Sequence, residues 1–485
     1  MHLGCRFSLL ALSFLSSCCI SMPKWQQQEE LLPSPSLECS LERGAESPFF
    51  AVGPWPDENW WEIFSSDQLN SLISIALANN PSIQEVYSRV LKARAKAVYA
   101  RAPLFPLLFF DAQDSWSYLS KNGLYKTLNP NISSNASLID LSLSVTYDFD
   151  FWCKNENLFL AALGKERSKE AERAQVELVV TTNLAQAYFA LQTNLYREKL
   201  IQNLVTERSK LFQLQNVLRK EAINSLFPQL LSEERFYEAE EQLAAIHAEV
   251  LSNYHTINVL LGQSPDAPLC LCEELPPLPE RLIIPETISL DLVARRPDLL
   301  AQIWRVEALG HEVGAAIADF FPDVNIKAFV GLESVFYSRL FQAGSMTGGA
   351  TPALHLPIFT AGAISANVWI KRTKFDAAVF AYNELLLRSA QEVADLIAFG
   401  ESVFRQKQEQ EKVVQSAQER YRLTYLRLSK GLDSRLQSYV IYDDWLQKEL
   451  TNVTLLYNQY AAAIKLIKAL GGGYCAEVPL EGSYE

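Results

Sequence analysis

The sequence is poor in the residues that build most metal and nucleotide sites. Among 485 residues there are only five histidines, and none lies in an HExxH or Cys/His finger spacing. We find no glycine-rich phosphate loop and no nucleophile paired with a base. These absences exclude most zinc-enzyme classes. They predict a protein that is not an enzyme and that uses no metal or other cofactor.

Positive charge is also under-represented. There are 43 Lys and Arg residues against 56 Asp and Glu residues, which gives a net charge of -13. A surface this acidic repels phosphate backbones, so we expect no nucleic-acid partner. Only 19 glycines and 22 prolines are present, which excludes a collagen-like or low-complexity chain. Because 49% of the residues are hydrophobic, the chain can bury a sizeable core.

The first residues have the features of an export signal. Arg6 precedes the apolar run 7–15, and Leu15-Ser16-Ser17-Cys18 resembles the bacterial lipobox. The run is shorter than the roughly 20 residues that span a bilayer, and no later segment is apolar enough to do so. We therefore predict a signal peptide over 1–17 and an acylated Cys18 that anchors the chain to a membrane. The alternative is an ordinary signal peptide with Cys18 as a plain cysteine.

The other cysteines do not form a recognisable metal motif. Cys270 and Cys272 flank a leucine in a proline-rich stretch, where they could act as a metal or redox pair. Without a CxxC or Cys/His cluster, a loop disulfide or free thiols are favoured. The sequence leaves open the pairing of Cys39, Cys153, Cys270, Cys272 and Cys475.

A long internal repeat organises the chain. Asn80-Pro81 is followed 25 residues later by Phe105-Pro106, and Arg296-Pro297 is followed 25 residues later by Phe321-Pro322. The two pairs are separated by 216 residues. We interpret this as two copies of one unit of about 200 residues, which indicates a duplicated domain rather than a solenoid of short repeats.

Alternating apolar and polar residues predict two strands in each unit. Residues 139–151 alternate without a break, and 324–332 and 350–358 alternate in the second unit. A half-buried sheet over a soluble core would explain the pattern, and so would membrane strands of about 9–11 residues. The length of the first run favours membrane strands, as does an aromatic cluster at its end. That cluster comprises Tyr147, Phe149, Phe151 and Trp152.

Each pair of strands is followed by very long helices. Four segments are almost free of glycine and proline: 165–227, 229–261, 363–430 (interrupted only by Gly400) and 432–470. A helix of about 65 residues is roughly 100 Å long, which suits a coiled coil or a helical tube. We expect the chain to reverse at Phe227-Pro228 and at Gly431.

The strand count has a consequence for assembly. Four strands cannot close a barrel, because about eight is the smallest workable number. Open strand edges are not tolerated in lipid, so strands that span a membrane require several chains to share one barrel.

Five segments carry a family resemblance. They are NWWEIF at 59–64, LVARRPDL at 292–299, AAIADFFP at 315–322, LPIFTAG at 356–362 and KALGGG at 468–473. In this order they resemble the TolC-like outer-membrane efflux family, in its acylated OprM-like and NodT-type branch. The similarity runs from about residue 55 to 475.

The resemblance implies an α+β membrane protein made of a duplicated helix-strand-strand-long helix-long helix unit. Three protomers would form one twelve-stranded outer-membrane β-barrel, surrounded by lipid and continued by a periplasmic α-helical barrel. Such a homotrimer passively conducts substrates that an inner-membrane pump delivers through a periplasmic adaptor. We therefore expect a cell outer-membrane location with a large periplasmic part.

The expected organisation follows from the repeat and the resemblance. The expected parts are a signal peptide (1–17), an acylated linker (18–58), a first repeat (59–263, strands about 107–151, long helices 155–262), a Pro-rich linker (264–286), a second repeat (287–472, helix 288–320, strands 324–359, long helices 361–470) and a tail (473–485).

The Arg295-Arg296-Pro297-Asp298 motif has two interpretations. It could dock an adaptor or bind an anion. A structural role explains it as well, because arginines complement a helix C-terminus, Pro297 suits the first position of the next helix and Asp298 suits its positive end. We favour the structural role.

The resemblance also implies a gate at the periplasmic entrance, where this chain departs from the family pattern. Gly431 and Leu436 match, but Val440 stands at the expected acidic position and Asp443 and Asp444 follow a turn later. The candidate gate residues are thus Leu436, Val440, Asp443 and Asp444, as an apolar or an acidic constriction. In the first unit, Glu221 stands where the turn glycine is expected. A solvated helix face is the alternative role for the two aspartates.

Two other functions compete with efflux. A duct of the same family could secrete polypeptides, as in type I systems. A lipid-anchored coiled-coil scaffold or adhesin, with its strands in a soluble hairpin domain, would need no pore. His247 and His255 lie eight residues apart on one expected helix and are interpreted as helix-surface residues.

Overall fold

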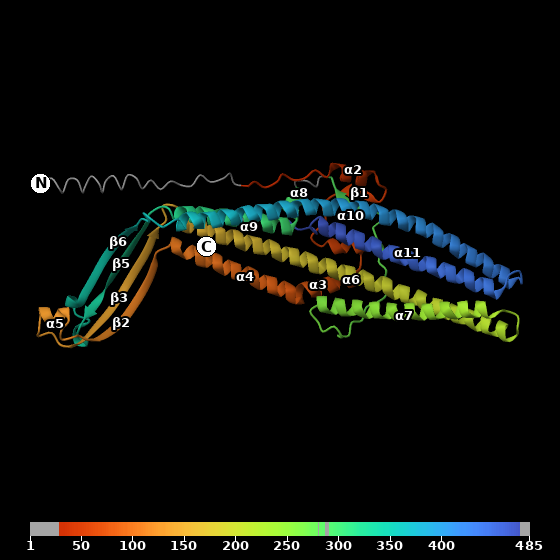
Figure 1. Cartoon of the computed structure of the whole chain (residues 1–485), viewed down its shortest axis with the longest axis horizontal. Helices are drawn as coiled ribbons and strands as arrows, with labels where there is room; N and C mark the ends of the chain where they lie inside the picture. Colours follow the sequence, from red (N-terminus) through yellow and green to blue (C-terminus); the bar gives the residue numbers. More distant parts are fainter. Residues whose placement is uncertain (1–28, 280, 287–290, 476–485) are drawn as a thin grey trace. The chain divides into compact units, whose positions relative to one another are not determined.

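The computed structural model describes residues 29–279, 281–286 and 291–475. Figure 1 labels its helices and strands. The chain divides into two compact units. Unit 1 comprises mainly Val90–Ser168 and Gln302–Ala381, and unit 2 comprises Leu32–Arg89, Lys169–Ala301 and the residues from Tyr382 onward. Each unit takes segments from both halves of the sequence.

Unit 1 contains a four-stranded antiparallel sheet in the order β2-β3-β5-β6. Figure 1 shows the strands side by side. The strands are β2 (Leu107–Tyr118), β3 (Asn135–Phe149), β5 (Asp323–Ser334) and β6 (Met346–His355). The register sets Leu143 of β3 opposite Phe110 and Val330, and sets Ser144 opposite Phe109 and Phe329. Successive residues therefore point to opposite faces of the sheet.

Short connections join the strands of unit 1. The helix α5 (Leu124–Leu128) lies between β2 and β3, and the 3₁₀ turns η3 (Tyr337–Arg339) and η4 (Ala343–Ser345) lie between β5 and β6. The last strand ends at His355, earlier than the expected 358–359. The next residues include Pro357, which has no backbone N–H to donate to a neighbouring strand.

Paired helices precede the strands in each half. They are α3 (Asp67–Asn79) and α4 (Pro81–Arg101), followed by the 3₁₀ turn η2 (Ala102–Leu104), in the first half, and α8 (Asp291–Arg295) and α9 (Pro297–Ala318) in the second. Both breaks come at a proline that begins the second helix, which the sequence predicts for Pro297. Asn80 supports the first break, because its Nδ2 donates to the Leu260 carbonyl at 2.8 Å and its Oδ1 accepts from the Ser82 N–H at 2.9 Å.

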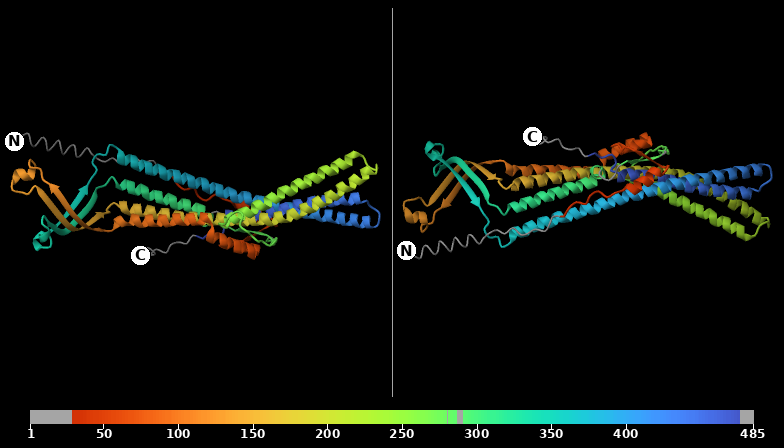
Figure 2. Two further views of the ribbon diagram at one scale, coloured as in Figure 1. Left: turned by 90° about the horizontal axis from the view of Figure 1, so that it is seen from below. Right: turned by 90° about the horizontal axis from the view of Figure 1, so that it is seen from above.

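Two long helical hairpins follow the strands. Helices α6 (Lys154–Lys220) and α10 (Ala363–Ser429) have 67 residues each, and α7 (Leu226–Leu260) and α11 (Arg435–Ala469) have 35 each. The views in Figure 2 show the turns of both hairpins at the same end of unit 2. Among the described helices, none is long and apolar enough to cross a membrane.

The first hairpin reverses earlier than expected. The chain turns at 221–225, and Phe227-Pro228 lies within the first turn of α7. The prediction of a turn at Pro228 was wrong because the first helical N–H groups have no intrahelical partner, so a proline there costs no hydrogen bond. Pro228 lies in the first turn of a helix instead of ending one.

The core of unit 2 joins helices from both hairpins. Leu200 and Leu204 of α6 pack with Ala239 of α7 and with Leu446 and Val453 of α11. These side chains are fully or almost fully buried. Since the contacts link α11 to α6 and α7, the two hairpins of this unit are held together by shared apolar packing.

A small parallel sheet lies in segments that the sequence analysis treats as linkers. Strand β1 (Phe50–Gly53), preceded by α2 (Glu38–Glu46), pairs with β4 (Leu282–Pro285). Helix α10 passes without a break through Gly400 beside them. A Cβ at Gly400 would lie 3.1 Å from the Phe50 ring. The glycine therefore makes room for β1 rather than interrupting the helix.

Candidate functional site

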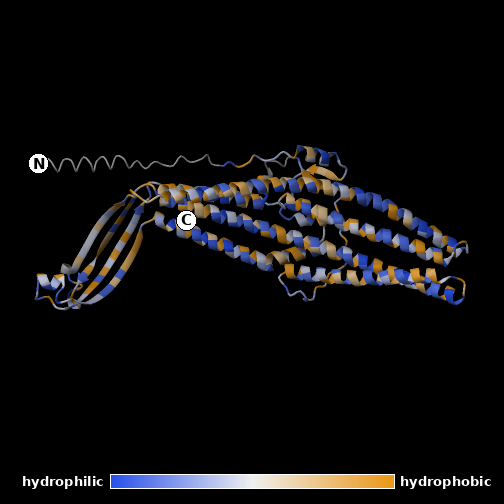
Figure 3. Cartoon of the chain, in the orientation of Figure 1, coloured by the Kyte–Doolittle hydropathy of each residue, from blue (hydrophilic) through white to orange (hydrophobic). Residues whose placement is uncertain are grey.

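The sheet of unit 1 has one strongly apolar face. It carries Leu108, Phe110, Leu143, Val330 and Leu354, all of which are exposed, with Phe110 at 68%. Figure 3 shows the alternation of hydrophobic and hydrophilic residues along the strands. Contiguous exposed apolar surface of this kind marks a face that contacts lipid or protein.

The opposite face is mostly polar. Ser142 donates to Asp140 at 2.7 Å and Ser144 donates to Asp111 at 3.3 Å on this face. Lys327 lies beside Thr146 in the register. In the sheet as described, β2 and β6 each have a neighbour on one side only. The sheet thus separates an apolar surface from a polar one and offers two open edges.

Aromatic residues gather at one end of the sheet, as the sequence predicts. The Tyr147 and Phe149 ring centroids are 5.0 Å apart, and Phe149 stacks on Phe151 at 5.7 Å. Trp152 stacks on Phe321 at 4.5 Å and donates its Nε1–H to the Pro322 carbonyl at 3.0 Å. Rings with an apolar body and a polar atom suit the boundary between lipid and water.

The expected entrance residues lie on the first turns of α11. Leu436 is half-buried and Val440 is 39% exposed. Asp444 forms ion pairs with Arg420 and, at 3.6 Å, with Lys448. The structure places all four candidates on one helix near the turn of the second hairpin, with both carboxylates engaged by arginine.

Asp443 contacts the first hairpin. Its carboxylate accepts from Arg208 Nε of α6 at 2.6 Å, and the same guanidinium donates to the Arg235 carbonyl of α7 at 2.7 Å. The side chains of Arg208 and Asp443 are only 8% and 19% exposed. A buried ion pair therefore links three helices at this level of the two hairpins.

Sequence reasoning missed Arg208, which is 235 residues from Asp443 along the chain. One signal was present. Leu204, Arg208 and Leu211 follow each other at steps of four and three, so the arginine interrupts an apolar helical stripe. A charge in such a stripe needs a buried partner, although the pattern does not say which one.

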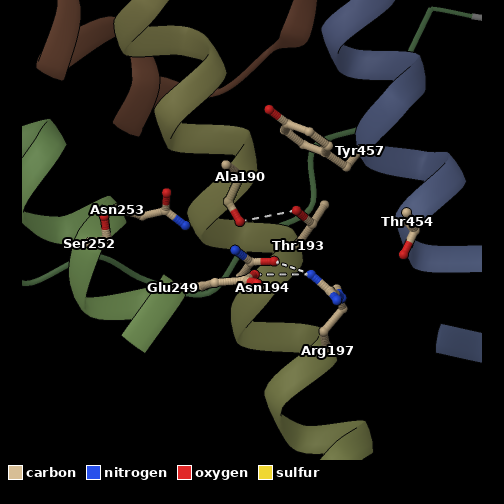
Figure 4. A pocket seen from close by; sticks show the side chains of 9 residues that line it. All are labelled: Ala190, Thr193, Asn194, Arg197, Glu249, Ser252, Asn253, Thr454 and Tyr457. Atoms are coloured by element: carbon tan, nitrogen blue, oxygen red, sulfur yellow. Dashed lines mark hydrogen bonds and ion pairs between the residues drawn. The ribbon is translucent and has the colours of Figure 1, made fainter. Parts of the chain in front are cut away.

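A polar pocket of about 300 Å³ lies among α6, α7 and α11 (Figure 4). Arg197 Nη1 donates to Asn194 Oδ1 at 2.9 Å and to Glu249 Oε2 at 3.3 Å. Burial raises the pKa of Tyr457 in its wall. The charged groups of this pocket bind each other. Within the described ranges, no group of three His, Cys, Asp or Glu side chains is arranged to hold a metal.

Arg296 has the structural role that the motif suggests, with contacts beyond those expected. Helix α8 ends at Arg295 and α9 begins at Pro297. The buried Arg296 guanidinium donates to Asp298 at 2.8 Å, to Glu392 at 2.9 Å and to the Ala469 carbonyl at 3.0 Å. Burial opposes its charge, but Asp298 and Glu392 outweigh burial and raise the pKa of Arg296. The side chain closes the C-terminal end of α11.

Among the residues that the structure describes, the cysteines and histidines add no reactive cluster. The signal segment and Cys18 lie outside the described residues. Cys39, Cys153, Cys270, Cys272 and Cys475 are all free and exposed. His247 pairs with Glu198 at 2.6 Å and His255 lies 3.5 Å from Asp266, both with partly exposed side chains.

Comparison with known proteins identifies the family. The model of the family described as "Outer membrane efflux protein" matches residues 72–263 and 289–472. The multidrug resistance outer membrane protein MdtP of Escherichia coli O6:H1 is 26% identical over 488 residues, which cover 96% of this chain and 97% of that protein. The MdtQ protein of the same organism is 27% identical, covering 87% of this chain and 89% of its own.

Solved structures agree in fold. The outer membrane protein VceC from Vibrio cholerae has a TM-score of 0.77 and 28% identity, covering 86% of this chain and all of that chain. The Campylobacter jejuni CmeC outer membrane channel has a TM-score of 0.80 and 20% identity, covering 94% and 96%. The matches confirm the efflux function and the outer-membrane location expected from the motifs. The chain therefore belongs to the outer membrane efflux protein family.

Proposed function

We propose that this chain is the outer-membrane duct of a tripartite efflux system. Substrates would pass through it passively to the exterior, delivered by an inner-membrane pump through a periplasmic adaptor. The relatives MdtP and MdtQ are named multidrug resistance proteins, which supports small-molecule cargo. The chain itself would carry out no chemical reaction.

The duct is proposed to be a homotrimer. One chain supplies four strands with open edges at β2 and β6. Edge N–H and C=O groups cannot remain unpaired in lipid, so β6 of one copy would pair with β2 of the next. Three copies would give a twelve-stranded barrel, which exceeds the minimum of about eight strands. The long hairpins would continue it as a helical tunnel in the periplasm.

One observation carries this proposal: the same sheet has an exposed apolar face and a polar face. In a barrel the first would contact outer-membrane lipid and the second would line the water-filled lumen. Neither requirement applies to a coiled-coil scaffold whose strands form a soluble hairpin. The two functions can therefore be distinguished by whether the two faces of the sheet differ in their tolerance of a charged side chain.

Adjacent residues of β3 provide a matched test. Leu143→Lys places a charge on the apolar face and should destabilise the barrel by about 2–4 kcal/mol if it lies near the midplane. Ser144→Lys places the same charge on the polar face and should be tolerated. The measurement is the yield of folded, heat-resistant oligomer and its conductance in planar bilayers. Equal tolerance of both substitutions, together with no conductance, would favour the scaffold.

We further propose that the start of α11 forms the periplasmic gate. In a three-fold assembly Leu436 and Val440 would each appear three times and resist hydrated ions. Asp443 and Asp444 would add carboxylates, although their arginine partners reduce the net charge at this level. An apolar constriction with a compensated acidic ring is therefore the arrangement best supported by these contacts.

Single-channel recording tests the gate. Leu436→Ala should raise the open fraction because it removes apolar bulk. Asp443→Asn should lower cation preference because it removes one carboxylate per protomer. Asp266→Asn changes an exposed carboxylate outside α11 and serves as the control. Unchanged opening and selectivity in both test variants would place the gate elsewhere, and we would then assign it to the turn between α6 and α7 near Phe227.

Membrane anchoring through Cys18 is a separate proposal. It is supported by the lipobox-like sequence that precedes this cysteine. Cys18→Ser should leave the protein unacylated while its strands still insert. Mass spectrometry of the mature amino terminus would contradict the proposal if it showed any terminus other than acylated residue 18.

A further inference from the structure

We propose that unit 2, in addition to its proposed part in conduction, contains a binding site for an amphiphilic organic cation. A cavity of about 550 Å³ lies where three parts of this unit meet. They are the segment 54–63, which reaches into the 3₁₀ turn η1 (Trp60–Phe64), residues 279 and 281–283 at and before β4, and residues 463–467 near the end of α11. This volume is within the usual range of small-molecule sites.

The walls of the cavity are largely apolar. Trp60 is 2% exposed and forms a fixed part of the lining, edge-to-face with Trp61 at 5.8 Å. Ile63 and Ile283 also line the cavity and are 44% and 50% exposed. An apolar ligand that covered these side chains would remove hydrophobic surface from water, which is the main driving force for such binding.

Charge at the cavity selects the sign of the ligand. Asp57, Glu58 and Glu62 line it, against the guanidinium of Arg281 in the lining and that of Arg295 over the Trp55 ring. The structure gives none of these three carboxylates an ion pair with another described residue, unlike Glu249 in the polar pocket of Figure 4. Carboxylates that form no ion pair, beside apolar walls, attract a positively charged ligand and repel an anion.

The aromatic residues are suited to the same charge. The Arg295 guanidinium lies over the Trp55 ring at 5.2 Å from its centroid, so this ring already takes part in one cation–π contact. Trp60 also lines the cavity, but at 2% exposure it shapes the wall and presents almost no ring surface to a ligand. Trp55 is only partly buried, so it is the indole that a cationic ligand would contact, beside or in place of Arg295.

Other occupants match the cavity less well. The terminal segment 476–485, outside the described residues, contains Glu477, Glu481 and Glu485. Three further carboxylates would be repelled by the acidic lining. The apolar walls and the excess of carboxylates over guanidinium groups together favour a ligand that is both apolar and cationic.

The test uses the purified full-length protein in a non-ionic detergent and requires no conduction. Ethidium is an aromatic cation and anilinonaphthalene sulfonate is an aromatic anion of similar size. Fluorescence polarisation should show saturable ethidium binding at least tenfold tighter than binding of the anion. Asp57→Asn combined with Glu62→Gln should weaken ethidium binding about tenfold. The affinities for the two probes should then be similar. Glu234→Gln, an exposed carboxylate on α7, should change nothing.

Apolar variants test the walls. Ile283→Trp at the edge of the cavity should reduce the binding of both probes, and circular dichroism checks that it folds. Ile63→Ser keeps the space but removes apolar surface, and should weaken ethidium binding several-fold. The proposal is overturned if ethidium binding is absent or insensitive to the carboxylate and isoleucine variants. It is also overturned if removal of residues 476–485 increases ethidium binding tenfold, because the cavity then belongs to that segment.

Discussion

The turn between α6 and α7 and the turn between α10 and α11 have the same backbone hydrogen bonds but different residues. Ile223 N–H donates to the Leu218 carbonyl at 2.9 Å, and Leu432 N–H donates to the Arg427 carbonyl at 2.9 Å. One residue earlier, the N–H groups of Ala222 and Gly431 make equivalent bonds. Both helices thus end in a Schellman motif.

The residue in the left-handed position differs between the turns. Gly431 has φ 72° and Ala222 has φ 55°. The sequence analysis places Glu221 opposite the expected glycine, whereas the structure places Ala222 there. A residue with a Cβ in this conformation costs roughly 1–2 kcal/mol, so the first turn holds strain that the second avoids.

The start of the returning helix differs as well. Ser434 caps α11 by accepting from the Gln437 N–H at 3.2 Å, whereas Ser225 at the same place before α7 makes no side-chain cap bond. The residue three positions after Ser225 is Pro228, which has no N–H to donate. The first turn therefore has the capping residue without its hydrogen bond.

Charge separates the two turns further. At the second turn Arg427 pairs with Asp433 at 2.7 Å. At the first turn, Asn224 donates to Gln215 at 3.0 Å, and Phe227 is 72% exposed. The comparison shows that the same turn geometry forms with a glycine, a serine cap and an ion pair in the second turn, and without them in the first. The weaker turn then depends more on contacts between helices.

The largest expected effect comes from the buried pair that joins the hairpins. Arg208→Met leaves the Asp443 carboxylate without its arginine and should destabilise the helices around it by about 3–5 kcal/mol. Arg420→Met breaks the more exposed pair with Asp444 and should cost only about 0–1 kcal/mol. Hydrogen exchange of the amides of α6 and α11 measures both. Similar small losses in the two variants would show that the hairpins are held by apolar packing alone.

A residue exchange between the turns should have an intermediate effect. Gly431→Ala should destabilise the second turn by about 1–2 kcal/mol, because no neighbour within 4 Å obstructs a Cβ and only the left-handed φ is penalised. Ala222→Gly should stabilise the first turn by up to a similar amount. Amide exchange in the last turns of α10 and α6 reports each change. Opposite signs are expected, and a shared sign would contradict the equivalence of the two positions.

The capping serines should give the smallest effect. Ser434→Ala should cost about 1 kcal/mol because it removes the cap of α11. Ser225→Ala should change little, since its side chain caps nothing. Exchange rates in the first turns of α11 and α7 measure the difference, with about a fivefold faster rate expected only for the first variant. A loss at Ser225 equal to that at Ser434 would reveal a cap that the structure does not contain.

Much of the architecture was predictable from local pattern. Alternation at 139–151 predicted β3, and glycine-free and proline-free segments predicted the long helices. Pro297 marked a helix start correctly, because a proline at the first helical position loses no hydrogen bond. The chain was expected to reverse at Pro228, but this proline lies in the first turn of a helix. Local pattern did not indicate β1 and β4, whose four-residue strands are too short to show a period.

The sequence by itself determined the strands of the larger sheet, the long helices, and that one sheet face is apolar and the other polar. These properties depend on the spacing of neighbouring residues, which the sequence states directly. Only the tertiary structure decided that Arg208 meets Asp443, that Gly400 makes room for Phe50, and that Ala222 adopts the left-handed conformation. Each of these depends on residues brought together from distant parts of the chain or on packing that holds a strained backbone in place. No local spacing records such contacts.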